Sequence, residues 1–169
     1  MFVESCDTLD VEADELWTEA YQGEILGELV FTLMAERAED PQRRRVLETL
    51  ALFERSTKEL AAPLLARRGI PPGDNEATTA ESATMAHAAA DLPWRDFLGF
   101  FQPEVSEFVA KYRRLVTLAG DDDERRIAEA YVAHEEALET FLRRSLGEEP
   151  GDPFEPIFAV PHVAAANSR

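Results

Sequence analysis

The chain has 169 residues, 34 of them acidic and 17 basic, and its formal net charge is −17. Contacts to nucleic-acid phosphates need a clustered basic face, and the short run Arg43-Arg44-Arg45 lies among acidic turns, so we expect no nucleic-acid partner. Hydrophobic residues make up 45% of the chain, which excludes a disordered acidic tail. The single cysteine, Cys6, excludes an internal disulfide.

No apolar run reaches the ~18 residues of a membrane span, and residues 1–4 lack the basic and apolar segments that open a secretory signal. We therefore expect a cytoplasmic protein with no membrane partner. The length indicates a single domain over residues 1–169.

Two long helices are predicted first, over about residues 10–39 and 41–68. Asp40 and Pro41 separate them, because Asp caps a helix start and Pro fits the first turn. Gly69 ends the second helix.

Residues 70–93 are small and polar, and we interpret them mainly as a connection with room for a short helix around residues 81–90. A third long helix follows and ends at Gly120. Pro103 either kinks this helix or marks its start.

A fourth helix is predicted from its cap, Asp121, to Leu146, with Gly147 closing it. Residues 148–169 carry four of the ten prolines and are predicted to form an extended, non-helical tail. Four apolar side chains of the tail are expected to dock onto the body: Phe154, Ile157, Phe158 and Val160.

These elements predict an all-α fold of two helical hairpins joined by one long connection. A helix of about 27 residues spans ~40 Å, and the connection over residues 70–93 is long enough to run back along it. The second and third helices then lie parallel, in a four-helix bundle over about residues 10–147 with a long crossover. The competing up-down-up-down arrangement does not need so long a connection.

An inward stripe on the fourth helix carries a histidine. Its residues recur at spacings of three and four, with His134 at the centre. His134 is therefore either a hydrogen-bonded core residue or a ligand. Glu135, Glu136 and Glu139 fall outside the stripe and are predicted to form a solvated face. The stripe consists of Ile127, Tyr131, His134, Leu138, Phe141 and Ser145.

The first helix places Glu24 and Glu28 one turn apart within a segment that is apolar on all sides. A buried carboxylate without a partner is costly, so such a residue becomes neutral or binds a cation. The alternative is that these carboxylates reach solvent at the edge of the helix.

The second and third helices add carboxylates at a matching height. Glu54 falls within the inward arc of the second helix; on the third, Glu104 lies near the inward stripe and Glu107 at its margin, where both are alternatively solvated. Counted from the hairpin turns, Glu54 is level with residue 26 and His134 with residue 108. Carboxylates with one imidazole in a bundle core suit iron or manganese better than structural zinc.

These residues resemble the ferritin-like superfamily, in particular its rubrerythrin-like branch. The similarity covers residues 10–147 and rests on Gly23-Glu24, repeated as Gly27-Glu28, then Glu54, Glu104-x-x-Glu107 and His134. It implies the crossover bundle, and a site in which carboxylates hold two irons that react with oxygen or peroxide. Other members of the family store iron.

The chain departs from the family pattern, which has Glu-x-x-His on both the second and the fourth helix. Thr57 stands where a histidine is expected, and Tyr131 where a carboxylate is expected. The remaining candidates suffice for one metal ion, or for two with water completing the ligands: Glu24 or Glu28, Glu54, Glu104 or Glu107, and His134.

We assign Thr57 to hydrogen-bonding of the oxygen substrate, whereas Tyr131 is open to three interpretations: a ligand, a redox-active phenol or packing. His87 and His162 are expected to be solvated or locally bonded. The cysteine module of some rubrerythrins is absent, so a separate electron donor is expected.

The leading hypothesis is a non-haem iron or manganese oxidoreductase that uses oxygen or peroxide. The alternative is a metal-free bundle that acts as an interaction or structural module. A first helix that is apolar on all faces also favours a homodimer.

Overall fold

The computed structural model describes residues 4–71, 73 and 75–167, and in this part of the chain every regular element is a helix. This confirms the prediction of an all-α fold. None of the described helices combines the length and apolarity that crossing a bilayer requires. The helices are α1 (Glu4–Arg37), α2 (Pro41–Arg68), α3 (Glu76–Ala90), α4 (Trp94–Leu118), α5 (Asp122–Leu146), α6 (Glu155–Ala159) and α7 (Pro161–Asn167).

Capping residues fix the ends of α2 and α5 where the sequence predicts them. The Asp40 carboxylate accepts hydrogen bonds from the backbone N–H groups of Gln42 and Arg43, and Asp121 caps α5 in the same way. Gly69 and Gly147 close the two helices with φ of 73° and 78°, a left-handed conformation that glycine adopts without strain.

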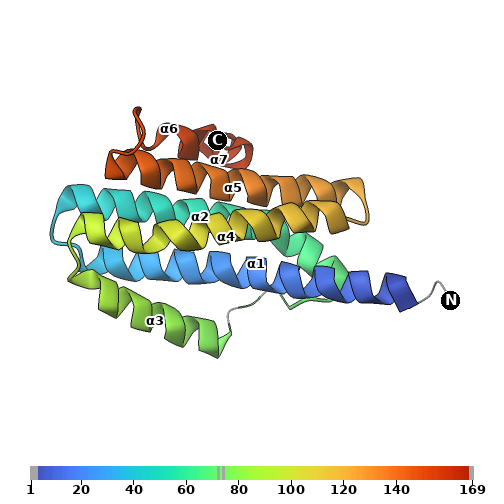
Figure 1. Cartoon of the computed structure of the whole chain (residues 1–169). Coiled ribbons are helices and arrows are strands. Elements are labelled where there is room, and N and C mark those ends of the chain that lie inside the picture. Colours follow the sequence, from blue (N-terminus) through green and yellow to red (C-terminus); the bar gives the residue numbers. More distant parts are fainter. Residues whose placement is uncertain (1–3, 72, 74, 168–169) are drawn as a thin grey trace.

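The helices α1, α2, α4 and α5 lie side by side (Figure 1). α1 packs against α2, α4 against α5, and the two hairpins meet through contacts between α1 and α4 and between α2 and α5. α2 and α4 run in the same direction, so the connection between them returns along the length of the molecule (Figure 1).

Residues 70–93 connect α2 and α4 as predicted, but the helix within them, α3, starts at Glu76 and is longer than the short helix allowed around residues 81–90. Asn75 caps this helix by accepting a hydrogen bond from the Thr78 N–H. Its buried residues, Thr78, Ser82, Ala86 and Ala89, recur at helical spacing but are all small, so they form no conspicuous apolar stripe.

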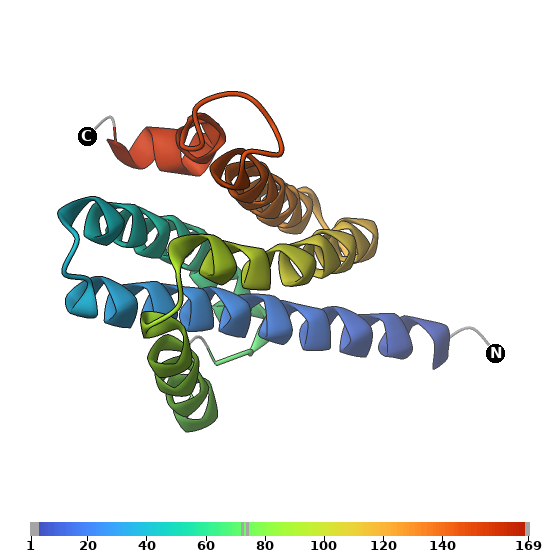
Figure 2. The same ribbon diagram turned by 60° about the vertical axis from the view of Figure 1, so that its left-hand side comes forward.

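α3 packs on the outer side of α1 (Figure 2). This contact explains why the middle of α1 is apolar all round, because α2, α4 and α3 cover it within one chain. The apolar segment therefore no longer argues for a homodimer.

Pro103 lies inside α4, which begins at Trp94 and ends at Leu118, just before Gly120. The alternative in which Pro103 marks the helix start is therefore wrong.

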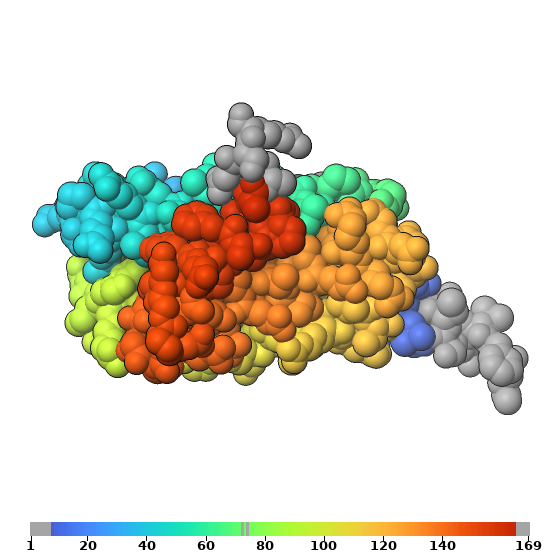
Figure 3. Space-filling model, turned by 90° about the horizontal axis from the view of Figure 1, so that it is seen from above, coloured from blue at the N-terminus to red at the C-terminus, as the bar shows by residue number. Residues whose placement is uncertain are grey.

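The C-terminal tail is also not extended as predicted, since it forms α6 and α7. Pro156 and Pro161 stand at helix starts, where the missing N–H has no helical partner to lose. Ile157 and Val160 are buried, Phe154 is half-buried and Phe158 is half-exposed. The tail crosses the outer face of α2 and α5 (Figure 3).

A polar layer divides the core into two apolar clusters. In three helices the buried apolar residues of one cluster stop and those of the other begin at the same height. The interruptions lie between Ile25 and Val30 in α1, between Phe53 and Ala61 in α2, and between Tyr131 and Ala137 in α5.

Candidate metal centre

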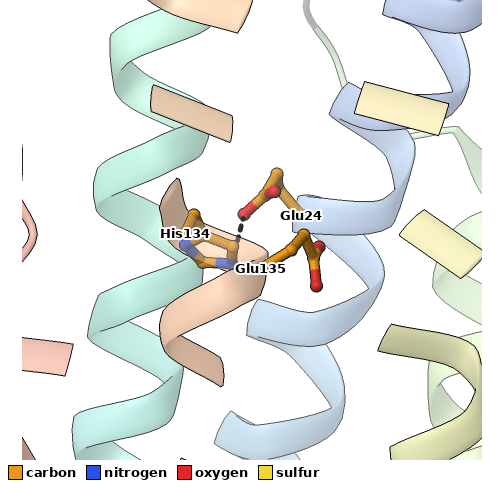
Figure 4. Close-up of side chains that lie close together, drawn as sticks. All are labelled: Glu24, His134 and Glu135. Atoms are coloured by element: carbon orange, nitrogen blue, oxygen red, sulfur yellow. Dashed lines mark ion pairs between the residues drawn. The ribbon is translucent and has the colours of Figure 1, made fainter. Parts of the chain in front are cut away.

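Four buried titratable side chains lie in or directly beside this polar layer. Glu24 comes from α1, Glu54 from α2, and His134 and Glu135 from consecutive positions of α5. Glu24 and His134 are only 1% and 0% exposed. One ligand atom from each of Glu24, His134 and Glu135 lies within 4.8 Å of the other two, and Figure 4 shows Glu24 pointing at the imidazole. This group can hold a metal ion.

The His134 ring is fixed on both its face and its edges. Its plane stacks on Phe53 with 4.0 Å between ring centroids. Nε2 faces the carboxylates, at 3.5 Å from Glu24 Oε2 and 3.4 Å from Glu54 Oε2. Nδ1 faces the opposite way and lies 2.8 Å from Thr57 Oγ1.

The carboxyl groups of Glu24 and Glu135 lose their protons less readily than free carboxyl groups do. Burial, followed by the charges of Glu54 and Glu135, raises the pKa of Glu24 well above its ordinary value. Burial, followed by the charge of Glu54, raises the pKa of Glu135 in the same direction. The cluster therefore disfavours negative charge unless a cation is present.

Three buried atoms of the cluster have no hydrogen-bond partner among the described residues: Glu24 Oε2, His134 Nε2 and Glu135 Oε2. Buried polar atoms are nearly always paired, because an unpaired one keeps its full desolvation cost. Glu24 Oε2 lies 3.5 Å from His134 Nε2, and Glu135 offers a carboxylate oxygen within 4.8 Å of the ligand atoms of both residues, so the group fits a bound cation.

Aromatic side chains border the cluster on one side. Tyr131 meets Trp17 and Tyr112 edge to face, with ring centroids 5.8 Å and 5.2 Å away. Its hydroxyl is buried and has no hydrogen-bond partner in the described part of the chain. Burial raises the pKa values of Tyr131 and Tyr112, so both phenols are protonated at neutral pH. These contacts favour the packing interpretation of Tyr131.

A narrow pocket leads toward the cluster between α1, α3 and α4. Its volume is about 140 Å³, and both Glu54 and Glu135 contribute to its lining. Phe31, Phe101 and Phe108 make much of the wall apolar. The buried carboxyl groups are thus reachable by small species along a mostly apolar path.

Three carboxylates proposed from the sequence lie outside the cluster. Glu28 is held by Arg55 at 2.6 Å and by Lys58 at 2.5 Å, and these cations lower its pKa although its partial burial opposes them. Glu104 is exposed and lines the pocket, and Glu107 is exposed on α4. The sequence left two choices open, Glu24 or Glu28 and Glu104 or Glu107. Of these four residues, the structure brings only Glu24 close to His134.

Glu135 was assigned to a solvated face, and the structure corrects this assignment because the residue is only 5% exposed. α5 packs against both α2 and α4, so its buried surface is wider than one stripe. Glu135 lies four residues after Tyr131 and three before Leu138, both buried, and this helical spacing is a signal from which its burial could be predicted.

His162 was expected to be solvated or locally bonded, but its Nε2 lies 2.9 Å from Thr57 Oγ1, far away in the sequence. No local sequence pattern indicates this contact. His87, in contrast, is exposed on α3 and lies near Arg37.

No protein-family model matches this chain, and the comparisons with curated proteins and with solved structures also find no match.

Proposed function

We propose that this chain is a ferritin-like four-helix protein that binds non-haem iron or manganese and acts as an oxidoreductase on oxygen or peroxide. The parallel course of α2 and α4 and the long connection between them support the crossover topology of this fold. The fold alone does not imply the function, so the proposal depends on the site.

The observation that carries the proposal is the buried group of Glu24, His134 and Glu135. Their ligand atoms lie within 4.8 Å of one another, and each residue has a buried atom without a hydrogen-bond partner among the described residues. Glu54 adds a fourth donor at 3.4 Å from the same imidazole nitrogen. Oxygen-rich ligand sets with one imidazole suit iron or manganese, whereas structural zinc sites are commonly rich in cysteine.

Glu24, Glu54, His134 and Glu135 would hold the ion, and a bound iron or manganese would supply redox chemistry and Lewis acidity toward oxygen or peroxide. The surrounding apolar clusters exclude bulk water and keep the carboxylates close together. Reduction of the site would require a separate electron donor.

The structure changes the role that we assign to Thr57. Its hydroxyl lies on the Nδ1 side of His134, away from the carboxylates, and contacts His162 as well. We therefore assign Thr57 to orienting His134 rather than to contacting the substrate.

The pocket lining bears on which substrate can reach the site. Much of its wall is apolar, with Phe31, Phe101 and Phe108 contributing, and offers few hydrogen-bond partners to a polar organic molecule. This favours a small substrate such as dioxygen or hydrogen peroxide. Glu81 and Glu104, which are exposed and line the same pocket, add negative charge that attracts incoming cations.

The test uses two matched substitutions one helical turn apart. Glu24→Gln removes a carboxylate from the cluster, whereas Glu28→Gln removes one from the ion pairs with Arg55 and Lys58. We expect Glu24→Gln to lose bound iron or manganese and Glu28→Gln to retain it, as measured by mass spectrometry of the purified proteins. Equal metal content in both variants and the wild type would contradict the proposed ligand set.

A further inference from the structure

The C-terminal segment reaches the metal centre through a chain of three side chains. α7 packs on α2 and places His162 Nε2 2.9 Å from Thr57 Oγ1. Thr57 Oγ1 lies in turn 2.8 Å from His134 Nδ1. The buried hydroxyl of α2 therefore joins two imidazoles, one from α5 and one from α7.

The hydroxyl has a single hydrogen to share among its neighbours. Besides the two imidazoles, the backbone oxygen of Phe53 lies 3.4 Å from Thr57 Oγ1, which is long for a hydroxyl hydrogen bond. Thr57 can therefore donate to one imidazole only and must accept from the other.

The surroundings of His134 decide between the two arrangements. Nδ1 has a close partner in Thr57, whereas Nε2 makes no hydrogen bond to any described residue. The carboxylate oxygens that face Nε2, Oε2 of Glu54 at 3.4 Å and Oε2 of Glu24 at 3.5 Å, are farther away than an ordinary N–H···O hydrogen bond allows, so a hydrogen on Nε2 would be poorly paired. His134 consequently carries its hydrogen on Nδ1 and donates it to Thr57, and the Thr57 hydrogen points to His162.

We propose that His162 is a positioning residue for the metal centre. By accepting the Thr57 hydrogen, it holds His134 in the Nδ1–H tautomer and leaves the Nε2 lone pair available to the proposed metal ion beside Glu24 and Glu54. This inference rests on the proposed metal-binding function and deepens it. Metal-binding histidines generally donate their other N–H to a fixed acceptor, and here that acceptor is Thr57, itself oriented by the tail.

The protonation state of His162 suits this role. Burial, followed by the proximity of His134, lowers the pKa of His162 to about 4. The imidazole is therefore neutral at neutral pH, and its Nε2 is available as an acceptor. The threonine side chain at position 57 is shorter than the histidine that the ferritin-like pattern has there. The imidazole of His162, from α7, lies against the Thr57 hydroxyl.

The experiment compares three variants with the wild type. His162→Gln keeps an acceptor near the position of Nε2, and His162→Phe keeps a flat ring without one. Thr57→Val removes the hydroxyl and preserves its shape. His162 lies on a short surface helix, so loss of the fold is not expected, and circular dichroism checks this.

The first readout is the His134 tautomer in the metal-free protein, obtained from ¹⁵N chemical shifts of the imidazole. We expect the Nδ1–H form in the wild type and in His162→Gln, and a mixed or Nε2–H form in His162→Phe and Thr57→Val. An Nε2–H wild type, or an unchanged tautomer in His162→Phe, would overturn the inference.

The second readout is manganese(II) affinity, from the EPR signal of the unbound ion. We expect a loss of about 10–100-fold in His162→Phe and Thr57→Val, with near-wild-type affinity in His162→Gln. An equal loss in His162→Gln and His162→Phe would overturn the inference. Failure of the wild type to bind any metal would refute the proposed function. The tautomer is measured in metal-free protein, so that readout tests the role of His162 independently of metal binding.

Discussion

The side chain of Glu54 lies directly against the backbone of α1 at Gly27. A Cβ atom added at position 27 would lie 2.8 Å from Cδ and 2.9 Å from Oε2 of Glu54. Such distances are too short for non-bonded atoms, whose optimal separation is about 3.5–4.0 Å between carbons. Glu54 therefore occupies its place beside His134 because residue 27 has no side chain.

Gly27→Ala is expected to displace Glu54 and lower metal affinity at least ~10-fold, as loss of a ligand or its orientation does. Alanine raises helix propensity by about 1 kcal/mol over glycine, so the fold should survive. Gly23→Ala is the matched control, because its Cβ meets Tyr112 Oη at an ordinary 3.5 Å. Calorimetric titration with manganese(II) measures both variants, and equal affinities would contradict the assignment of Glu54.

Glu135→Gln is expected to stabilise the metal-free protein at neutral pH. The pKa of Glu135 is raised in the folded state, so its contribution to stability is greatest below its unfolded value of 4.5 and falls as the pH rises toward the folded value. Glutamine has no charge to bury, so we expect the variant to be more stable than the wild type at pH 7 and this difference to disappear below pH 4.5. Urea unfolding with chelator present measures it; a destabilised variant at pH 7 would contradict the prediction.

Tyr131→Phe distinguishes packing from chemistry at this position. The Tyr131 hydroxyl is buried without a described partner, so its removal should leave stability unchanged or raise it by about 1 kcal/mol. We expect unchanged metal content and unchanged reaction with oxygen, measured by thermal unfolding and by oxygen consumption. A loss of oxygen consumption with intact metal content would show that the phenol takes part in the reaction.

His162 is expected to titrate far below a free imidazole. Its folded-state pKa of about 4 lies below the ordinary 6.5, so the stability that its docking adds is fully present above 6.5 and is lost as the pH falls toward 4. An NMR titration of the His162 ring proton, assigned with His162→Gln, measures this pKa. A midpoint near 6.5 would show that the imidazole is not held against Thr57.

The sequence predicts the four long helices well, because local chemistry determines their ends. Asp40, Gly69, Asp121 and Gly147 act through hydrogen bonds and backbone angles within a few residues of themselves. α3 is harder to predict because its buried side, from Thr78 to Ala89, is made of small residues that pack closely on α1 without an apolar stripe.

The candidate site is predictable only in part. Helical spacing places His134 inward, and buried-charge energetics make Glu24 a candidate, but the choice between Glu24 and Glu28 depends on where Arg55 and Lys58 lie in space. The position of His162 depends on how the tail folds back over α2, which no local pattern determines.

The central claim is that the buried cluster binds a redox-active metal. The most direct measurement is the metal content of protein purified without chelator, by mass spectrometry, with an optical spectrum after addition of ferrous iron and air. We predict about one or two iron or manganese ions per chain and a ligand-to-metal band, both lost in His134→Ala. Wild-type protein without metal and without uptake, or His134→Ala with unchanged occupancy, would contradict the account.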